Sequence, residues 1–109
     1  MKDLKGSYPM ADTLGYLGLA RRAGRLSIGH DAALLSVRKG TAHLVLLTSD
    51  ASPRHQRELE AAGFKEKTAV IPYNMNETGV ATGKKSCIYA LEDEGFAKAI
   101  LNTLLKEGK

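Results

Sequence analysis

The sequence predicts a single α/β domain in which helices cover both sides of one β-sheet. Three observations lead to this fold class. Helical and extended patterns alternate along the chain, which is typical of α/β domains. The segment His43–Leu47 ends in four consecutive apolar residues, as in a strand covered on both faces. The length of 109 residues fits one domain, and no repeat or linker interrupts it.

The first helix is predicted to begin at Asp12 or Thr13 and to end near Ala23. Either residue suits an N-cap, because its side-chain oxygen can accept a hydrogen bond from a first-turn N–H group. Two glycines within this helix would let another backbone approach closely. Residues 1–12 show no apolar periodicity, so we expect them to form a flexible lead to a domain over residues 13–109.

The segment Gly24–Gly40 combines a helix stop, a short strand, a glycine turn and a new helix. The strand is predicted over Leu26–Ile28 and the helix over His30–Lys39, with Gly29 at the turn between them. A strand that passes through a glycine into a helix leaves first-turn N–H groups unpaired, and such groups can bind an anion such as phosphate. The alternative is that this is only how a strand meets a helix.

The middle of the chain continues the alternation of helices and strands. Ser52 followed by Pro53 is a strong helix start, since a capping side chain precedes a proline at the first helical position. This helix is expected to stop at Gly63. A strand is then predicted over Thr68–Pro72, with Val70-Ile71 at its centre.

Three further elements complete the predicted fold. Asn76 is expected to cap a short helix over Glu77–Thr82, and a strand follows over Ser86–Leu91. Asp93 is expected to cap the last helix. Its apolar stripe has helical spacing and is predicted to consist of Phe96, Ala97, Ile100, Leu101 and Leu104.

Three loops follow the carboxyl ends of predicted strands. They are Gly29–Asp31, Thr48–Ala51 and Tyr73–Asn76. Ligand sites of α/β sheets gather beyond the carboxyl ends of the strands. We therefore expect these loops to share one edge of the molecule.

Composition favours a polyanion as partner and excludes several classes of protein. The net charge is +4 and the pI is about 9.3, which weakly favours nucleic acid. The single cysteine, Cys87, excludes an internal disulfide and a paired-cysteine metal or redox site. The N-terminal residues lack the apolar core of a signal peptide, and no run of about twenty apolar residues could span a membrane. We therefore expect a cytoplasmic protein.

No catalytic, cofactor or metal site is predicted. Residues 79–86 read GVATGKKS, but a phosphate-binding P-loop needs one more residue between its glycines and a hydroxyl residue directly after the lysine. The three histidines are scattered without metal-ligand spacing. His43 is expected at a strand edge and His55 on a solvent face, which leaves His30 as the one histidine with a plausible role. Cys87 is expected to be a buried, inert thiol.

Basic residues around two glycine junctions favour nucleic acid as the polyanion. They are Arg21, Arg22, Arg25, Arg38, Lys39, Lys84 and Lys85. Four tyrosines, two phenylalanines and no tryptophan are too few for a stacking platform. Recognition by backbone amides, basic side chains and shape fits better. The alternative is an ordinary solvated basic surface.

The order of motifs along the chain resembles a known family. Residues 17–52 read LGLARRAGRLSIGHDAALLSVRKGTAHLVLLTSDAS. Gly79–Gly83 is similar to the family's LGxAxG motif, and Glu92–Lys98 is similar to its TDxGFAK motif. Together these segments resemble the large-subunit ribosomal protein seven-Ae and thirty-e superfamily of kink-turn RNA binders. Within it, the chain is most similar to the short bacterial YlxQ-like branch, over nearly all of residues 13–100.

The resemblance implies an α/β/α sandwich around a four-stranded mixed sheet, without enzymatic activity. It also implies binding of structured RNA, such as ribosomal RNA, at the strand-to-helix turn and at the loop before the LGxAxG helix. The residues expected to contact RNA are Arg25, Ser27, Gly29, His30, Asp31, Ala32, Leu35, Lys39, Tyr73, Asn74, Met75, Asn76, Thr78 and Lys84. Strong RNA binders of the family carry an amide or acidic pair where Asp31-Ala32 stands and a lysine where Leu35 stands.

A protein-interaction module is the alternative function. Asp31, Leu35 and Arg38 share one helical face, and an apolar residue between polar ones suits a protein contact. The partner would then be a ribosomal or translation protein bound at the same edge.

Overall fold

A four-stranded mixed sheet forms the centre of the computed structural model, which describes residues 12–107. Its strands are β1 (Leu26–Ile28), β2 (Leu44–Leu47), β3 (Thr68–Val70) and β4 (Ile88–Leu91). They lie in the order β1-β4-β2-β3. Since β4 is antiparallel to both β1 and β2, and β2 is parallel to β3, the strands β1, β2 and β3 all point toward the same edge of the sheet.

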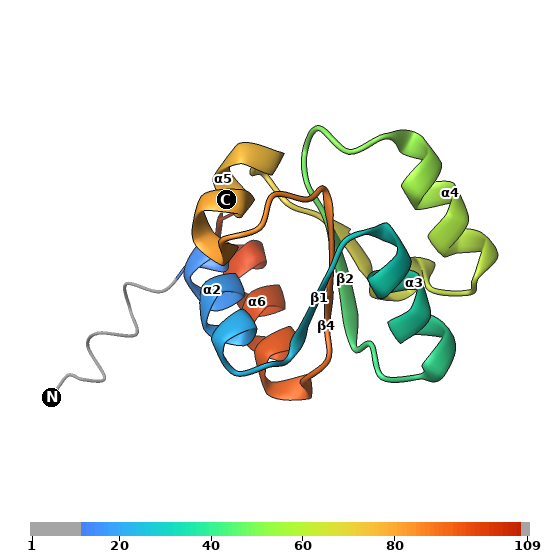
Figure 1. Cartoon of the computed structure of the whole chain (residues 1–109), viewed down its shortest axis with the longest axis horizontal. Coiled ribbons are helices and arrows are strands. Elements are labelled where there is room, and N and C mark those ends of the chain that lie inside the picture. Colours follow the sequence, from blue (N-terminus) through green and yellow to red (C-terminus); the bar gives the residue numbers. More distant parts are fainter. Residues whose placement is uncertain (1–11, 108–109) are drawn as a thin grey trace, which may run out of the picture.

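Helices cover both faces of this sheet, which confirms the predicted sandwich (Figure 1). One face carries α2 (Thr13–Arg22), α5 (Met75–Thr82) and α6 (Glu94–Glu107), and the other carries α3 (His30–Lys39) and α4 (Pro53–Ala61). A short 3₁₀ helix, η2 (Lys65–Lys67), which was not predicted, leads from α4 into β3. The flexible lead expected over residues 1–12 lies outside the described residues, apart from Asp12.

Each face of the sheet has its own apolar core. All four residues of β2 and all four of β4 are buried, as expected for strands covered on both sides. Tyr89, Leu46 and Ile100 pack with α2 on one face, whereas Val45, Ile88 and Leu59 pack with α3 on the other. The predicted stripe of the last helix is wrong at one position. Leu101 is 42% exposed, because it follows Ile100 and has rotated away from the sheet.

Close packing of α2 on α5 explains one of the two glycines in the first helix. A Cβ atom at Gly18 would lie 2.9 Å from the carbonyl oxygen of Ala81. The two helices could therefore not approach this closely with any larger residue. The guanidinium of Arg21 donates a hydrogen bond to the carbonyl oxygen of Thr82, which ties the ends of the same two helices together.

Most predicted helix caps are confirmed, and one is corrected. The carboxylate of Asp12, the hydroxyl of Ser52 and the carboxylate of Asp93 each accept a hydrogen bond from a first-turn N–H group. The cap of α5 is Asn74 and not Asn76. Its side chain accepts from the N–H of Glu77 at 2.9 Å, and the Glu77 carboxylate accepts from the N–H of Asn74 at 2.8 Å. This reciprocal capping box starts the helix at Met75, earlier than expected.

Two predicted strands are shorter than expected at the same edge. β3 ends at Val70 rather than Pro72, and β4 begins at Ile88 rather than Ser86. Pro72 has no N–H group to continue the ladder. Before β4, the hydroxyl of Ser86 turns back on the chain, since it accepts from the N–H of Ile88 and donates to the carbonyl of the same residue. Within the described part of the chain, every helix is too short or too polar to span a membrane.

Replacing Asn74 with alanine should lower the free energy of unfolding by about 1 kcal/mol, because the capping box is lost. Asn76→Ala is the matched control. It is the second residue of α5, at an exposed position whose side chain takes no part in the capping box, and we expect it to change stability by less than about 0.5 kcal/mol. Urea unfolding of both variants checks this. A larger loss for Asn76→Ala than for Asn74→Ala would contradict the observed cap.

Candidate nucleic-acid interface

The three loops predicted to share one edge do share it. They surround the ends of β1, β2 and β3 together with the start of β4. The N–H of Gly29 donates to the carbonyl of Ile88, and the N–H of Thr48 donates to the carbonyl of Cys87, each at 3.0 Å. The N–H of Ser49 donates to the carbonyl of Tyr73 at 2.9 Å. We call this surface, formed by Gly29–Ala32, Thr48–Asp50 and Tyr73–Asn76, the carboxyl edge.

Gly29 makes the turn that opens α3 at this edge. Its backbone angles are φ 104° and ψ 161°, in a region that is essentially restricted to glycine. No atom lies within 4 Å of where a Cβ would stand, so the backbone conformation alone requires glycine. The predicted strand–glycine–helix unit is therefore confirmed.

The N-terminus of α3 differs from those of the other helices. Of the five α-helices in residues 12–107, α3 is the one whose first turn has no side-chain cap. Its first-turn N–H groups lie at the positive end of the helix dipole. Asp31 and Ala32 are exposed beside them, and Leu35 is 51% exposed one turn further on. An anion could approach these groups from solvent.

The N-terminus of α5 lies at the same edge but is closed by the protein itself. Besides the capping box, the carboxylate of Asp50 accepts from the N–H of Met75 at 3.1 Å. The hydroxyl of Thr48 and this N–H hold the pKa of Asp50 below its ordinary value. The N–H groups of Asn74, Met75 and Glu77 are thus engaged within the protein, so this loop presents mainly side chains to a ligand.

Three of the predicted contact residues in or near this loop, Tyr73, Met75 and Thr78, are at least partly buried. Thr78 is fully buried, and its hydroxyl accepts a hydrogen bond from the hydroxyl of Tyr89 at 2.9 Å. The side chain of Thr78 thus belongs to the core and cannot contact RNA. Tyr73 is half-buried. Burial and the negative charge of Glu107 raise the pKa of Tyr73 to about 12.

Two of the basic residues predicted to contact RNA, Arg25 and Lys39, lie away from the carboxyl edge. The N–H of Glu92 donates to the carbonyl of Arg25 at 2.9 Å, and the charge of Lys39 helps to lower the pKa of Glu92. Glu92 directly follows the last residue of β4, whereas Gly29 hydrogen-bonds to the first residue of that strand. Arg25 and Lys39, which lie near Glu92, are therefore at the edge opposite to the carboxyl edge. The physical reason is that α3 runs antiparallel to β1, so the last turn of α3 lies beside the start of that strand.

Two other predicted contacts are also separated from the carboxyl edge. The hydroxyl of Ser27 donates to the carboxylate of Glu92 at 2.7 Å, so it is engaged within the protein. Lys84 is exposed after the C-terminus of α5, where Gly83 lies against the Arg21 side chain. The predicted residues brought together at the carboxyl edge are Gly29, His30, Asp31, Ala32, Tyr73, Asn74, Met75 and Asn76, with Leu35 on the adjoining turn.

A cluster of titratable side chains, missed from the sequence, lies between α3 and α4. The prediction that His55 faces solvent is wrong, since its side chain is 11% exposed and its ring centre lies 5.4 Å from that of His30. The Nε2 atom of His30 is 2.7 Å from a carboxylate oxygen of Glu58. Hydrogen bonds to Asp31 and Glu58 raise the pKa of His30, and His30 in turn lowers that of Glu58. The spacing of His55 and Glu58, three apart on a helix, was the available signal.

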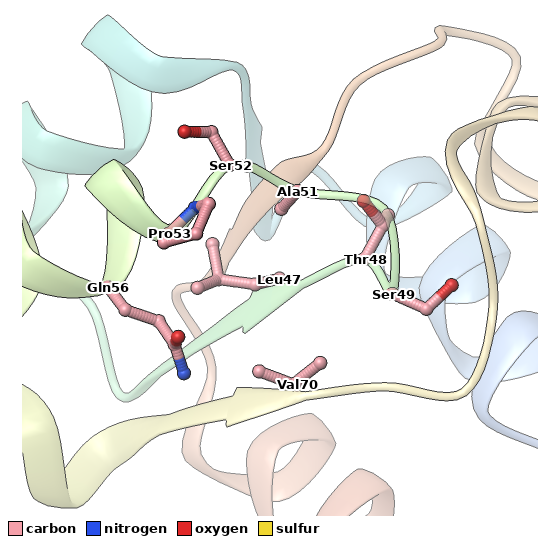
Figure 2. Close-up of a pocket in the computed structure, with 8 residues that line it drawn as sticks. All are labelled: Leu47, Thr48, Ser49, Ala51, Ser52, Pro53, Gln56 and Val70. Atoms are coloured by element: carbon pink, nitrogen blue, oxygen red, sulfur yellow. The ribbon is translucent and has the colours of Figure 1, made fainter.

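A small pocket of about 120 Å³ lies next to this edge, where β2 ends and α4 begins. Figure 2 shows Leu47 and Val70 on neighbouring strands, with Pro53 and Gln56 of α4 facing them. Its volume is below the roughly 300 Å³ of a typical small-molecule site. The pocket therefore does not alter the expectation that the edge itself is the functional surface.

Comparisons with known proteins agree with this architecture. Residues 11–101 match the model of the ribosomal protein L7Ae/L30e/S12e/Gadd45 family. The RNA-binding protein YlxQ of Bacillus subtilis is 33% identical over 93 residues, covering 81% of this chain and 90% of that protein. The large ribosomal subunit protein eL30 of Spodoptera frugiperda is 34% identical over 88 residues, covering 77% of this chain and 78% of that protein.

Solved structures share the fold. A protein of unknown function from Bacillus halodurans superposes with a TM-score of 0.76 at 29% identity, covering 86% of this chain and 97% of that one. A 15.5kD RNA-binding protein of Giardia lamblia superposes with a TM-score of 0.68 at 20% identity, covering 85% of this chain and 84% of that one. The second likeness is evidence for the fold alone.

Proposed function

Because the chain belongs to the L7Ae/L30e/S12e/Gadd45 family of ribosomal proteins, we propose that it binds structured RNA through the carboxyl edge. The named relatives are an RNA-binding protein and a ribosomal protein, not enzymes. The proposed ligand is a kink-turn or a similarly bent element, most simply in ribosomal RNA. The proposed role is non-enzymatic and belongs in the cytoplasm, where such RNA is found.

The uncapped N-terminus of α3 is the observation that carries this proposal. Its first-turn N–H groups and the helix dipole favour a phosphate group. Beside them, the fully exposed carboxylate of Asp31 can accept a hydrogen bond from a base amino group. Phosphate contacts would position the RNA, and the contact to a base edge would select it.

The second proposed contact is the loop before α5. Three strand spacings separate β1 from β3, or about 14 Å, so the two contacts could engage separate strands of a bent RNA. The loop would act mainly through the side chains of Tyr73, Met75 and Asn76. The N–H groups of Asn74, Met75 and Glu77 are already engaged within the protein. Recognition would then depend on the shape of the RNA.

A bulky residue placed at the carboxyl edge tests this proposal. Ala32→Trp puts an indole on the exposed first turn of α3, and Ala61→Trp puts the same group on the exposed last turn of α4 at the opposite edge. Neither variant changes the net charge. We expect Ala32→Trp to weaken binding of a kink-turn RNA at least ten-fold and Ala61→Trp to leave it unchanged. Fluorescence anisotropy with the kinked RNA, and with a straight duplex of the same length, measures both.

Equal affinity of the natural chain for the kinked and the straight RNA would contradict kink-turn recognition. Unchanged binding by Ala32→Trp would place the RNA elsewhere. A protein partner is then the second candidate for this edge. It is favoured by Leu35, which is 51% exposed between the exposed residues Asp31 and Arg38. Such a partner would bind in a salt-insensitive way, unlike RNA.

A further inference from the structure

The strongest unassigned feature of the described residues is the side-chain cluster between α3 and α4. His30, His55 and Glu58 place their ligand atoms within 4.8 Å of one another. One oxygen of Glu58 lies 2.7 Å from Nε2 of His30 and 3.8 Å from Nδ1 of His55. We propose that these three side chains bind a divalent transition-metal ion, with zinc as the natural occupant.

The arrangement has the dimensions of a zinc site. Bonds of about 2.0 to 2.2 Å in a tetrahedron place neighbouring ligand atoms roughly 3.3 Å apart. The two distances from the Glu58 oxygen lie on either side of this value. Small rotations of side chains that are 38% and 36% exposed, His30 and Glu58, would therefore complete the geometry. Their exposure also gives the ion a path from solvent.

Both helices hold the ligands on fixed backbone. His55 and Glu58 lie three apart on α4 and so project from the same face. Pairs of histidine and glutamate at this spacing supply metal ligands in helical metalloproteins. His30 is the first residue of α3. The Gly29 turn directly before it fixes the backbone position from which the imidazole projects.

In each of the two imidazoles, one ring nitrogen contacts a group outside the cluster and the other ring nitrogen faces the cluster. Nδ1 of His30 is 3.0 Å from the carboxylate of Asp31, and Nε2 of His55 is 3.4 Å from the sulfur of Cys87. Metal-binding histidines characteristically donate their other N–H group to such a partner, which fixes the tautomer. This leaves Nε2 of His30 and Nδ1 of His55 as the metal-facing atoms.

The remaining nitrogen of His55 is an independent sign of a missing ligand. Nδ1 of His55 is buried and has no hydrogen-bond partner among residues 12–107. Buried polar atoms are rarely left in this state. A metal ion would satisfy it. With three protein ligands, the fourth position of the ion would be open to water, and Cys87 would act as a positioning residue outside the ligand set.

Zinc titration of the chelator-treated full chain, followed by calorimetry, tests the proposal. We expect one saturable site per chain. His55→Ala and Glu58→Gln should each weaken zinc binding at least ten-fold. His43→Ala, which removes an exposed histidine outside the cluster, should leave it within about two-fold. Circular dichroism confirms that each variant is folded. Glu58→Gln serves as the decisive variant if His55→Ala is unstable.

A second readout uses cobalt in place of zinc. Co²⁺ bound by two imidazoles and one carboxylate should give the intense visible absorption of a four-coordinate ion, and the spectrum should be lost in Glu58→Gln but kept in His43→Ala. The proposal is overturned if the natural chain binds no zinc saturably. It is also overturned if binding survives both His55→Ala and Glu58→Gln, or if it is lost in His43→Ala.

Discussion

A double variant carrying Ala32→Glu and Leu35→Lys is expected to bind a kink-turn at least ten-fold more tightly than the natural chain. The two positions lie three apart on α3, so they face nearly the same way. The lysine would add a phosphate contact, and the glutamate could accept from an exposed base amino group. One charge-assisted hydrogen bond is worth roughly 1.5 to 3 kcal/mol before local costs, and about 1.4 kcal/mol is a factor of ten.

Effects of the two substitutions that oppose this gain in RNA affinity are smaller than the gain itself. A glutamate and a lysine three apart can pair with each other, which would offset only about 0.2 to 0.5 kcal/mol of the gain. The lysine would not disrupt the core, because Leu35 is 51% exposed and Ala32 lies on the surface. We therefore expect the melting temperature of the double variant to change by no more than a few degrees.

Matched RNAs separate recognition from general attraction in this experiment. The two substitutions cancel in charge, so the net charge of +4 is unchanged. Affinity for a straight duplex should therefore stay constant while affinity for the kink-turn rises. Equal and unchanged affinity for both RNAs, in a stably folded variant, would show that this edge does not read RNA. The protein-partner hypothesis would then lead.

Gly29→Ala is expected to lower the free energy of unfolding by about 1 to 3 kcal/mol and to weaken RNA binding by more than ten-fold. The stability loss follows from the backbone, since φ 104° with ψ 161° is strongly disfavoured for any residue with a Cβ. The loss of binding follows from position. Relaxing this residue would turn the first-turn N–H groups of α3 away from the carboxyl edge.

Gly40→Ala is the matched control for this variant. Gly40 closes the same helix with φ 77°, and it also has open space where a Cβ would stand. A left-handed conformation costs alanine about 1 to 2 kcal/mol. Both variants should therefore be less stable, but only Gly29→Ala should lose RNA. Urea unfolding and RNA titration at a temperature where both remain folded measure this. Equal RNA affinities would contradict a role for the Gly29 turn in binding.

Local sequence patterns predict the order of the elements and most of their ends. Capping side chains such as Ser52, positive-φ glycines such as Gly29 and the apolar run of β2 act within a few residues, so their pattern is readable in one dimension. The same locality made the α5 start predictable in principle. The capping box formed by Asn74 and Glu77 is visible in the sequence, and the prediction that Asn76 was the cap overlooked it.

Packing between distant segments determines which residues face the carboxyl edge. Arg25 and Lys39 are near Gly29 along the chain, but a strand and an antiparallel helix carry them to the opposite edge. Thr78 turned out to be a core residue, because its hydroxyl meets that of Tyr89 from another element. His30, His55 and Glu58 come from two helices. Their meeting depends on how α3 and α4 pack on one face of the sheet, and such long-range contacts leave no local pattern in the sequence.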